Sequence, residues 1–186
     1  MQTNLKKKLN LGSAEPPIHP QHMAVMEDYE NWQLVDFYVN HPEVMKMDAE
    51  TLDQVPDNYL EHIYASHLLE HIPHPKIYDV LNVWHRKLAP GGQLTINVPD
   101  IAWLARQILK FENGQLLTGV YSDFEGDRGL QSILYGTHAH EGERHQSGYT
   151  KRSLHEWLEG MGFKEIQIEE WFDAHDMGVL LATCKK

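Results

Sequence analysis

Short apolar segments recur along this chain, and loops or helical patterns separate them. Segments of this kind are typical of buried strands. Strands that alternate with helices form a mostly parallel sheet with helices on both faces, so the pattern predicts an α/β, doubly wound fold. The length favours a single domain over residues 1–186. Seven strands are expected, at residues 8–11, 33–36, 44–48, 61–66, 93–98, 164–169 and 179–184.

The segments between these strands carry signals for helices and for chain reversals. An apolar face at helical spacing runs from Ile77 to Leu88, and the Pro-Gly-Gly run that follows is expected to end this helix. Asp100 and Thr150 are good N-caps for two further helices. Three prolines within residues 14–21 predict a loop. The connection between the last two strands is too short for a helical crossover, which predicts an antiparallel pair.

The bulk properties disfavour several classes of protein. A formal net charge of −11 disfavours nucleic acid as a partner, because proteins that bind it usually carry a clustered basic face. No apolar run approaches the roughly 20 residues of a membrane-spanning helix, and the first residues lack the apolar core of a signal peptide. We therefore expect a cytoplasmic protein that has no nucleic-acid or membrane partner.

Four residues that suit a ligand-binding site follow or end the expected strands: Gly12, Asp36, Asp48 and Ser66. In a parallel sheet these positions meet at one rim, where ligands of such folds bind. Gly12 would let bare backbone approach a ligand closely, whereas the absence of a G-x-G-x-x-G pattern disfavours a pyrophosphate group. The alternative interpretation is that each carboxylate is only a loop residue or a helix cap.

Several motifs with these residues occur in a fixed order along the chain. They are Leu9-Asn10-Leu11-Gly12-Ser13, Val35-Asp36, Met47-Asp48-Ala49, Ala65-Ser66-His67-Leu68-Leu69-Glu70-His71, Pro90-Gly91-Gly92 and Val98-Pro99-Asp100. In this order they resemble the class I S-adenosylmethionine-dependent methyltransferases, most of all the small predicted methyltransferases of that superfamily. The resemblance implies a Rossmann-like methyltransferase fold with an antiparallel last strand and S-adenosyl-L-methionine as the cofactor.

The same resemblance implies how the first two motifs would contact the cofactor. Leu11, Gly12 and Ser13 would lie beside its methionine moiety and ribose. Asp36 would accept hydrogen bonds from both ribose hydroxyls, a task that suits a carboxylate because it only accepts and can take two donors at once.

The later motifs would hold the adenine and the reacting group. By resemblance, Asp48 would accept a hydrogen bond from the adenine amino group, and Ala49 would offer its backbone N–H to the ring. Ser66 and His67 would border the sulfonium and the methyl group.

Residues 112–149 form an insert that we expect to recognise the substrate. Within it, His138 and His145 are the first candidates for contact with the acceptor or for removal of its proton. The histidines of the insert match no strong metal-binding motif, so no metal is expected. His71 is expected to have a structural role at the start of a helix.

The function predicted from these observations is methyl transfer from S-adenosylmethionine to a small-molecule or glycan-like acceptor. Two alternatives remain open. One is a protein that keeps this fold, with or without its cofactor, but transfers nothing. The other is a metal-dependent hydrolase built around His138, His140 and His145.

Overall fold

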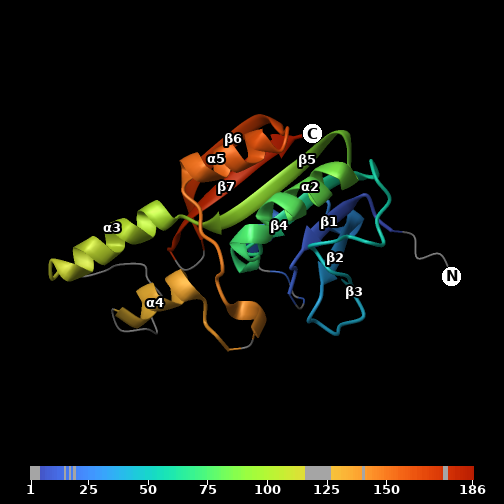
Figure 1. The fold of residues 1–186 in the computed structure, drawn as a ribbon. Coiled ribbons are helices and arrows are strands. Elements are labelled where there is room, and N and C mark those ends of the chain that lie inside the picture. Colours follow the sequence, from blue (N-terminus) through green and yellow to red (C-terminus); the bar gives the residue numbers. More distant parts are fainter. Residues whose placement is uncertain are drawn as a thin grey trace.

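The computed structural model describes residues 5–14, 16, 18, 20–115, 127–139, 141–173 and 176–186. Its centre is one seven-stranded sheet in the order β3-β2-β1-β4-β5-β7-β6 (Figure 1). β7 is antiparallel to both of its neighbours, β5 and β6, whereas the other pairs are parallel. The strands are β1 (Lys8–Leu11), β2 (Trp32–Asp36), β3 (Val44–Lys46), β4 (Leu60–Ser66), β5 (Leu88–Pro99), β6 (Lys164–Phe172) and β7 (Gly178–Lys185).

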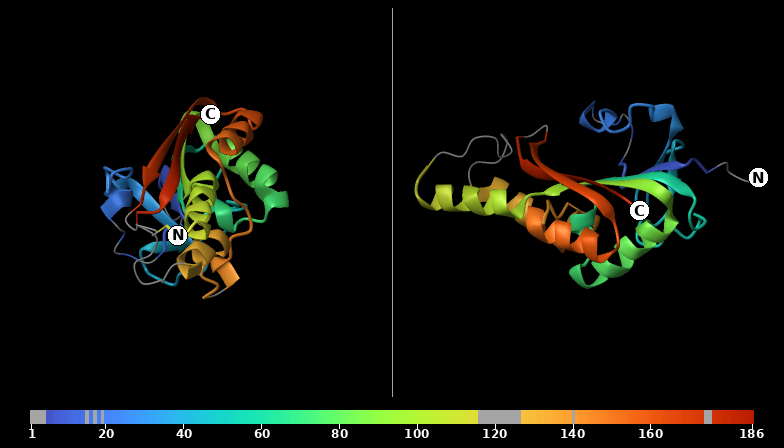
Figure 2. Two further views of the ribbon diagram at one scale, coloured as in Figure 1. Left: turned by 90° about the vertical axis from the view of Figure 1, so that its left-hand side faces the viewer. Right: turned by 90° about the horizontal axis from the view of Figure 1, so that it is seen from above.

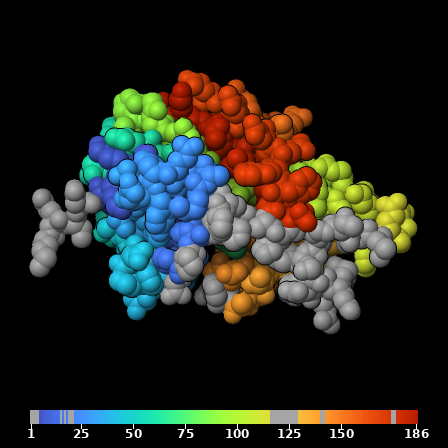
Figure 3. All heavy atoms as spheres, turned by 180° about the vertical axis from the view of Figure 1, so that it is seen from behind, coloured from blue at the N-terminus to red at the C-terminus, as the bar shows by residue number. Residues whose placement is uncertain are grey.

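This topology confirms the predicted doubly wound sheet and its antiparallel last strand, although the helices cover its two faces unequally. On one face, α2 (Ile77–Lys87) and α5 (Lys151–Gly160) pack together in the main core (Figures 1 and 2). On the other face, the described residues place only the short α1 (Pro20–Met23) and the 3₁₀ turn η1 (Tyr29–Asn31). Seen from behind in Figure 3, this second face is formed by the early part of the chain beside β6 and β7.

The remaining helices lie beyond the carboxyl end of β5. α3 (Ile101–Glu112) extends away from the sheet (Figure 1). α4 (Asp127–Tyr135) packs against α3 through a separate small cluster that includes Leu104 and Ile133. Three further 3₁₀ turns are η2 (Leu69–His71), η3 (His74–Lys76) and η4 (Glu141–Glu143). Among the described residues, no helix has both the length and the apolar character needed to cross a membrane.

The predicted N-caps are confirmed. The Asp100 carboxylate accepts a hydrogen bond from Ala102 N at 2.8 Å at the start of α3. Thr150 and Ser153 form a reciprocal capping box at the start of α5. Because both caps satisfy backbone N–H groups that would otherwise lack partners, they fix where these helices begin.

Two local expectations are wrong. α1 begins at Pro20, inside the segment predicted to be a loop, because proline is well tolerated in the first turn of a helix. The Pro90-Gly91-Gly92 run does not end α2, which stops at Lys87 before the strand pairing of Leu88. The run lies instead in β5, where the register with β4 is irregular between Leu60 and His62.

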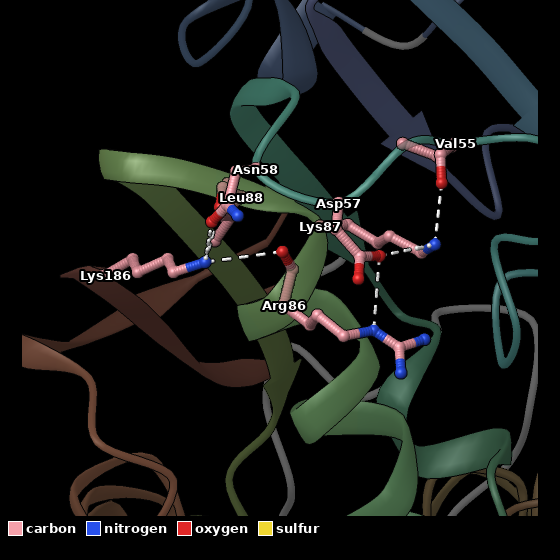
Figure 4. A network of polar contacts seen from close by, with 7 residues as sticks. All are labelled: Val55, Asp57, Asn58, Arg86, Lys87, Leu88 and Lys186. Carbon is pink, nitrogen blue, oxygen red and sulfur yellow. Dashed lines mark hydrogen bonds and ion pairs between the residues drawn. The ribbon is translucent and has the colours of Figure 1, made fainter.

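A polar network at the amino ends of β4 and β5 joins the loop before β4, the junction of α2 with β5, and Lys186 (Figure 4). The buried Lys87 ammonium donates to Val55 O at 2.6 Å and lies 2.9 Å from Asp57 Oδ1. Lys186 donates to Asn58 Oδ1 at 2.6 Å and to Leu88 O at 2.8 Å. The last residue of the chain is thus tied to the start of β5.

His62 lies on the face of the sheet that α1 and η1 cover, and its pKa reports how well that face is buried. Its Nε2 lies 2.9 Å from Thr95 Oγ1, and its ring packs on Trp32 with the centroids 4.7 Å apart. Burial, assisted by the positive charge of Lys8, lowers the pKa of His62 to about 4. The folded protein therefore holds this imidazole neutral at pH values where the unfolded chain already protonates it.

We expect the free energy of unfolding to fall as the pH drops from about 6.5 towards 4, with roughly 1–3 kcal/mol of the loss due to His62. His62→Gln keeps a partner for Thr95 but cannot protonate. Urea unfolding at pH 7.5 and 4.5 should show a smaller loss for the variant than for the wild type. Equal losses in both proteins would contradict this role.

Candidate active site

A cavity of about 560 Å³ opens at the carboxyl ends of β1, β2, β3 and β4. This volume lies in the range of small-molecule sites, roughly 300–1,000 Å³. Four successive loops contribute to its lining: residues 12–14 after β1, residues 36–39 at and after β2, residues 47–50 after β3 and residues 66–68 at and after β4. The predicted rim of the sheet is therefore one continuous site.

The turn after β1 is shaped by Gly12. Its φ is +65°, and a Cβ at this position would lie 3.1 Å from Leu68 Cδ1. Ser13 N donates to Val35 O at 3.1 Å, which holds the turn against β2. The Leu11 side chain is fully buried in the core and does not line the cavity.

Asp36 clamps two of the cavity loops. Its Oδ1 accepts hydrogen bonds from Tyr38 N at 2.8 Å and from Val39 N at 3.1 Å. Its Oδ2 accepts from Ala14 N at 3.2 Å. Since an ionised carboxylate offers about four acceptor positions, Asp36 can be the loop cap of the alternative interpretation and still accept from a ligand.

The loop after β3 is anchored to the core. Asp48 Oδ1 accepts from Glu50 N at 2.8 Å, and the Asp48 carbonyl accepts from Leu52 N at 2.9 Å. The indole of the fully buried Trp84 donates to Ala49 O at 2.8 Å. A core side chain of α2 thereby fixes the position of Ala49 at the cavity wall.

Buried polar atoms without hydrogen-bond partners gather where β4 and β5 end. Among the described residues, Ser66 Oγ and Asn97 Oδ1 both lack a partner. His67 follows with φ +48°, a conformation that is costly for a residue with a side chain, and its N–H donates to Asn97 O at 2.8 Å. Unpaired groups and backbone strain of this kind cluster at functional sites.

The structure brings together seven of the eight residues predicted to contact a cofactor. Gly12, Ser13, Asp36, Asp48, Ala49, Ser66 and His67 all line the cavity. Leu11 does not, because strand alternation turns its side chain into the core.

Glu70 lies beside these residues in η2, is 1% exposed, and is not among the residues predicted from the sequence to form the site. His67 Nδ1 lies 3.2 Å from Glu70 Oε1. Burial disfavours both charges, yet Glu70 raises the pKa of His67, and His67 in turn lowers the pKa of Glu70. The signal in the sequence was a glutamate directly after two leucines, a position where an acidic residue is seldom placed without a partner.

The insert contributes to the cavity through η4. Gly142 and Glu143 line it, and a Cβ on Gly142 would lie 2.9 Å from Tyr38 Cε2. The predicted catalytic histidines lie outside the lining. His138 is exposed, with Nε2 2.9 Å from Tyr135 O, and His145 is half-buried, with Nδ1 2.8 Å from Ile133 O.

The histidine cluster of the hydrolase alternative consists of His138, His140 and His145. His140 lies outside the described residues. His71, expected to be structural, ends η2 and also lines the cavity.

The described lining is acidic. Asp36, Asp48 and Glu143 contribute carboxylates, as does Glu50, which pairs with Lys76 at 2.7 Å. The part of the lining that the structure describes includes no lysine or arginine. Such a surface suits a ligand with hydroxyl donors and positive charge, whereas phosphate groups usually require cationic side chains.

Comparison with known proteins agrees with this geometry. A family model described as a methyltransferase domain matches residues 14–168. A comparison with curated proteins gave no match.

Three solved structures are similar to this chain at low sequence identity. A SAM-dependent methyltransferase from Archaeoglobus fulgidus is 16% identical, with a TM-score of 0.61 over 98% of this chain and 87% of that one. The 1,6-didemethyltoxoflavin-N1-methyltransferase of Burkholderia thailandensis, solved with S-adenosylhomocysteine, is 18% identical (TM-score 0.62, 96% and 70%). A SAM-dependent methyltransferase from Methanosarcina mazei is 14% identical (TM-score 0.60, 98% and 94%).

The sheet order and the cavity at its carboxyl edge define a class I S-adenosylmethionine-dependent methyltransferase. The chain belongs to the methyltransferase-domain family, whose model covers most of its length. The predicted superfamily, the enzyme class and the cofactor S-adenosyl-L-methionine are thereby confirmed.

Proposed function

We propose that this methyltransferase acts on a small-molecule or glycan-like acceptor that enters beside η4. The observation that carries the proposal is the convergence of four strand-end loops and the insert on one cavity. The insert adds Gly142 and Glu143 to the wall of this cavity. In this proposal residues 112–149 recognise the acceptor.

The cofactor is proposed to lie along the sheet edge. Asp36, the last residue of β2, accepts hydrogen bonds from the ribose hydroxyls. Asp48 and Ala49, which follow the edge strand β3, contact the adenine. Gly12 and Ser13 lie beside the methionine moiety, where bare backbone permits a close approach. The acidic lining suits this cofactor as a whole, since its sulfonium and its α-ammonium group are both cationic.

The acceptor is proposed to carry hydroxyl groups and no phosphate. The described lining offers carboxylate and imidazole groups that accept or exchange hydrogen bonds with hydroxyls. Phe37 and Tyr38, 50% and 68% exposed, add aromatic surface at the same cavity. Aromatic faces beside polar groups suit a sugar or another small hydroxylated molecule.

Methyl transfer is an in-line displacement, so the acceptor atom must approach the methyl group from the side opposite the sulfur. When bound, the cofactor would supply an activated methyl group whose leaving group is a neutral thioether, and a hydroxyl acceptor would release one proton. Positioning supplies much of the rate, and Ser66 and His67 lie where this alignment is proposed. His138 stays a predicted proton acceptor although it does not line the described cavity, and His67 joins it because it does.

Turnover on a panel of acceptors tests the proposal. The purified chain, incubated with S-adenosylmethionine and hydroxylated small molecules or sugars, should release S-adenosylhomocysteine and leave one added methyl group on an acceptor. Phosphorylated members of the panel should react poorly. Calorimetry that shows no heat with either form of the cofactor, together with no protection against thermal unfolding, would overturn it.

A further inference from the structure

A group of potential metal ligands lies beside the cavity but outside the proposed cofactor contacts. One ligand atom each from Glu70, His71 and His145 lies within 4.8 Å of the others. The His71 and His145 rings meet edge to face, with centroids 4.8 Å apart. Two histidines and one carboxylate form a ligand set that zinc and other divalent transition metals commonly use.

Both histidines have their second ring nitrogen engaged in the way that metal ligands require. His71 Nδ1 lies 3.1 Å from Arg144 O, and His145 Nδ1 lies 2.8 Å from Ile133 O. A carbonyl oxygen only accepts, so each Nδ1 must carry the hydrogen. In the neutral imidazoles, Nε2 then has a free lone pair. Histidines that ligate metals usually donate their other N–H to a carbonyl or carboxylate in this manner.

The backbone around the three ligands is tied together across the fold. Gln146 N and Ser147 N both donate to Glu70 O, at 2.8 and 3.0 Å. Gln146 Nε2 donates to His71 O at 2.8 Å, and Ser147 Oγ donates to Leu69 O at 3.0 Å. These bonds hold the segment that carries His145 against η2, so the ligand group is preorganised before any ion binds.

Glu70 is the independent observation that points to a cation. Its side chain is 2% exposed, and neither carboxylate oxygen has a hydrogen-bond partner among the described residues. The nearest charge partner is His67, with Nδ1 3.2 Å from Oε1. This single ion pair leaves Oε2 of the buried carboxylate without a partner among the described residues, and a bound cation would offset that cost directly.

We propose that Glu70, His71 Nε2 and His145 Nε2 bind one divalent transition-metal ion, of the class of Zn²⁺ or Mn²⁺. Ligand atoms in a tetrahedral zinc site are about 3.3 Å apart, so small side-chain rotations close the observed spacing. Mg²⁺ is disfavoured because it demands oxygen ligands. His71 also lines the cavity, so a coordination position left for water or for a donor atom of a bound molecule faces the site.

Metal titration of the full, tag-free chain after chelator treatment tests the site. Zn²⁺ should bind at one equivalent by calorimetry, and Mg²⁺ should bind far more weakly. Co²⁺ should give the visible absorption of a site with nitrogen ligands. The result that overturns the proposal is the absence of both signals.

Matched variants place the ion. Glu70→Gln and His145→Gln should each weaken Zn²⁺ binding by roughly tenfold to 100-fold or more. His155→Gln, an exposed histidine of α5, should leave it unchanged. Circular dichroism identifies a variant that fails to fold. Zn²⁺ binding by the other ligand variant then tests the assignment. Unchanged binding in both ligand variants would show that the metal lies elsewhere and overturn the assignment.

Metal binding does not depend on the proposed function, whereas any role of the ion towards the acceptor rests on it. The metal site and the proposed function can therefore be contradicted independently. Loss of Zn²⁺ binding in the variants with no turnover on any acceptor would sustain the metal site alone. Turnover without metal binding would sustain the methyltransferase proposal alone.

Discussion

The Asp36→Asn variant is expected to bind S-adenosylhomocysteine roughly 10- to 100-fold more weakly than the wild type. The amide oxygen can still accept from Tyr38 N and Val39 N, so the loop after β2 keeps its cap. The amide nitrogen would replace Oδ2, which faces Ala14 N, and it cannot accept from a ribose hydroxyl. Binding weakens because charge-assisted hydrogen bonds to the carboxylate are lost and the amide N–H₂ group faces other donors.

Calorimetric titration with S-adenosylhomocysteine measures this effect, and thermal unfolding without ligand shows whether the fold is intact. Asp53→Asn is the matched control, because Asp53 is exposed and does not line the cavity. It should bind like the wild type. If Asp36→Asn and Asp53→Asn both bind S-adenosylhomocysteine as tightly as the wild type, the Asp36 carboxylate only stabilises the loops.

Trp84→Ala is expected to reduce the free energy of unfolding by about 3–5 kcal/mol. Trp84 is fully buried in the main core on α2, so the truncation leaves a cavity that its neighbours cannot fill. It also removes the hydrogen bond to Ala49 O. Denaturant unfolding measures the change directly.

Two further substitutions separate packing from the hydrogen bond. Trp84→Phe keeps most of the buried surface but leaves Ala49 O without the indole donor, so it should cost less stability yet still weaken S-adenosylhomocysteine binding. Trp171→Ala removes a tryptophan that is 44% exposed in β6 and should change stability much less than Trp84→Ala. Similar losses at the two positions would contradict the assignment of Trp84 to the core.

Much of the fold could be predicted because the local signals and the tertiary structure agree. The apolar face from Ile77 to Trp84 is the buried face of α2, and the caps Asp100 and Thr150 start the expected helices. The Pro90 run misled the prediction, since a proline and two glycines signal a break without saying whether the break lies after a helix or within a strand.

The site was predicted unevenly for a similar reason. Asp36, Asp48 and Ser66 could be found because the carboxyl ends of parallel strands meet by topology alone. Glu70 and its approach to His145 could not, since 75 residues separate them in the chain and the hydrogen bonds from residues 146 and 147 to η2 bring them together.

The sequence by itself determined the parallel sheet, its antiparallel ending and the rim at which the cavity opens, because strand and helix periodicity are local properties that topology rules convert into positions. Only the tertiary structure decided which groups are buried without partners and which loops close over the rim. Ser66 Oγ, Glu70 Oε2 and the contact of Gly142 with Tyr38 are of this kind. Burial and long-range hydrogen bonding depend on what the rest of the chain places around a residue, and no local pattern records that.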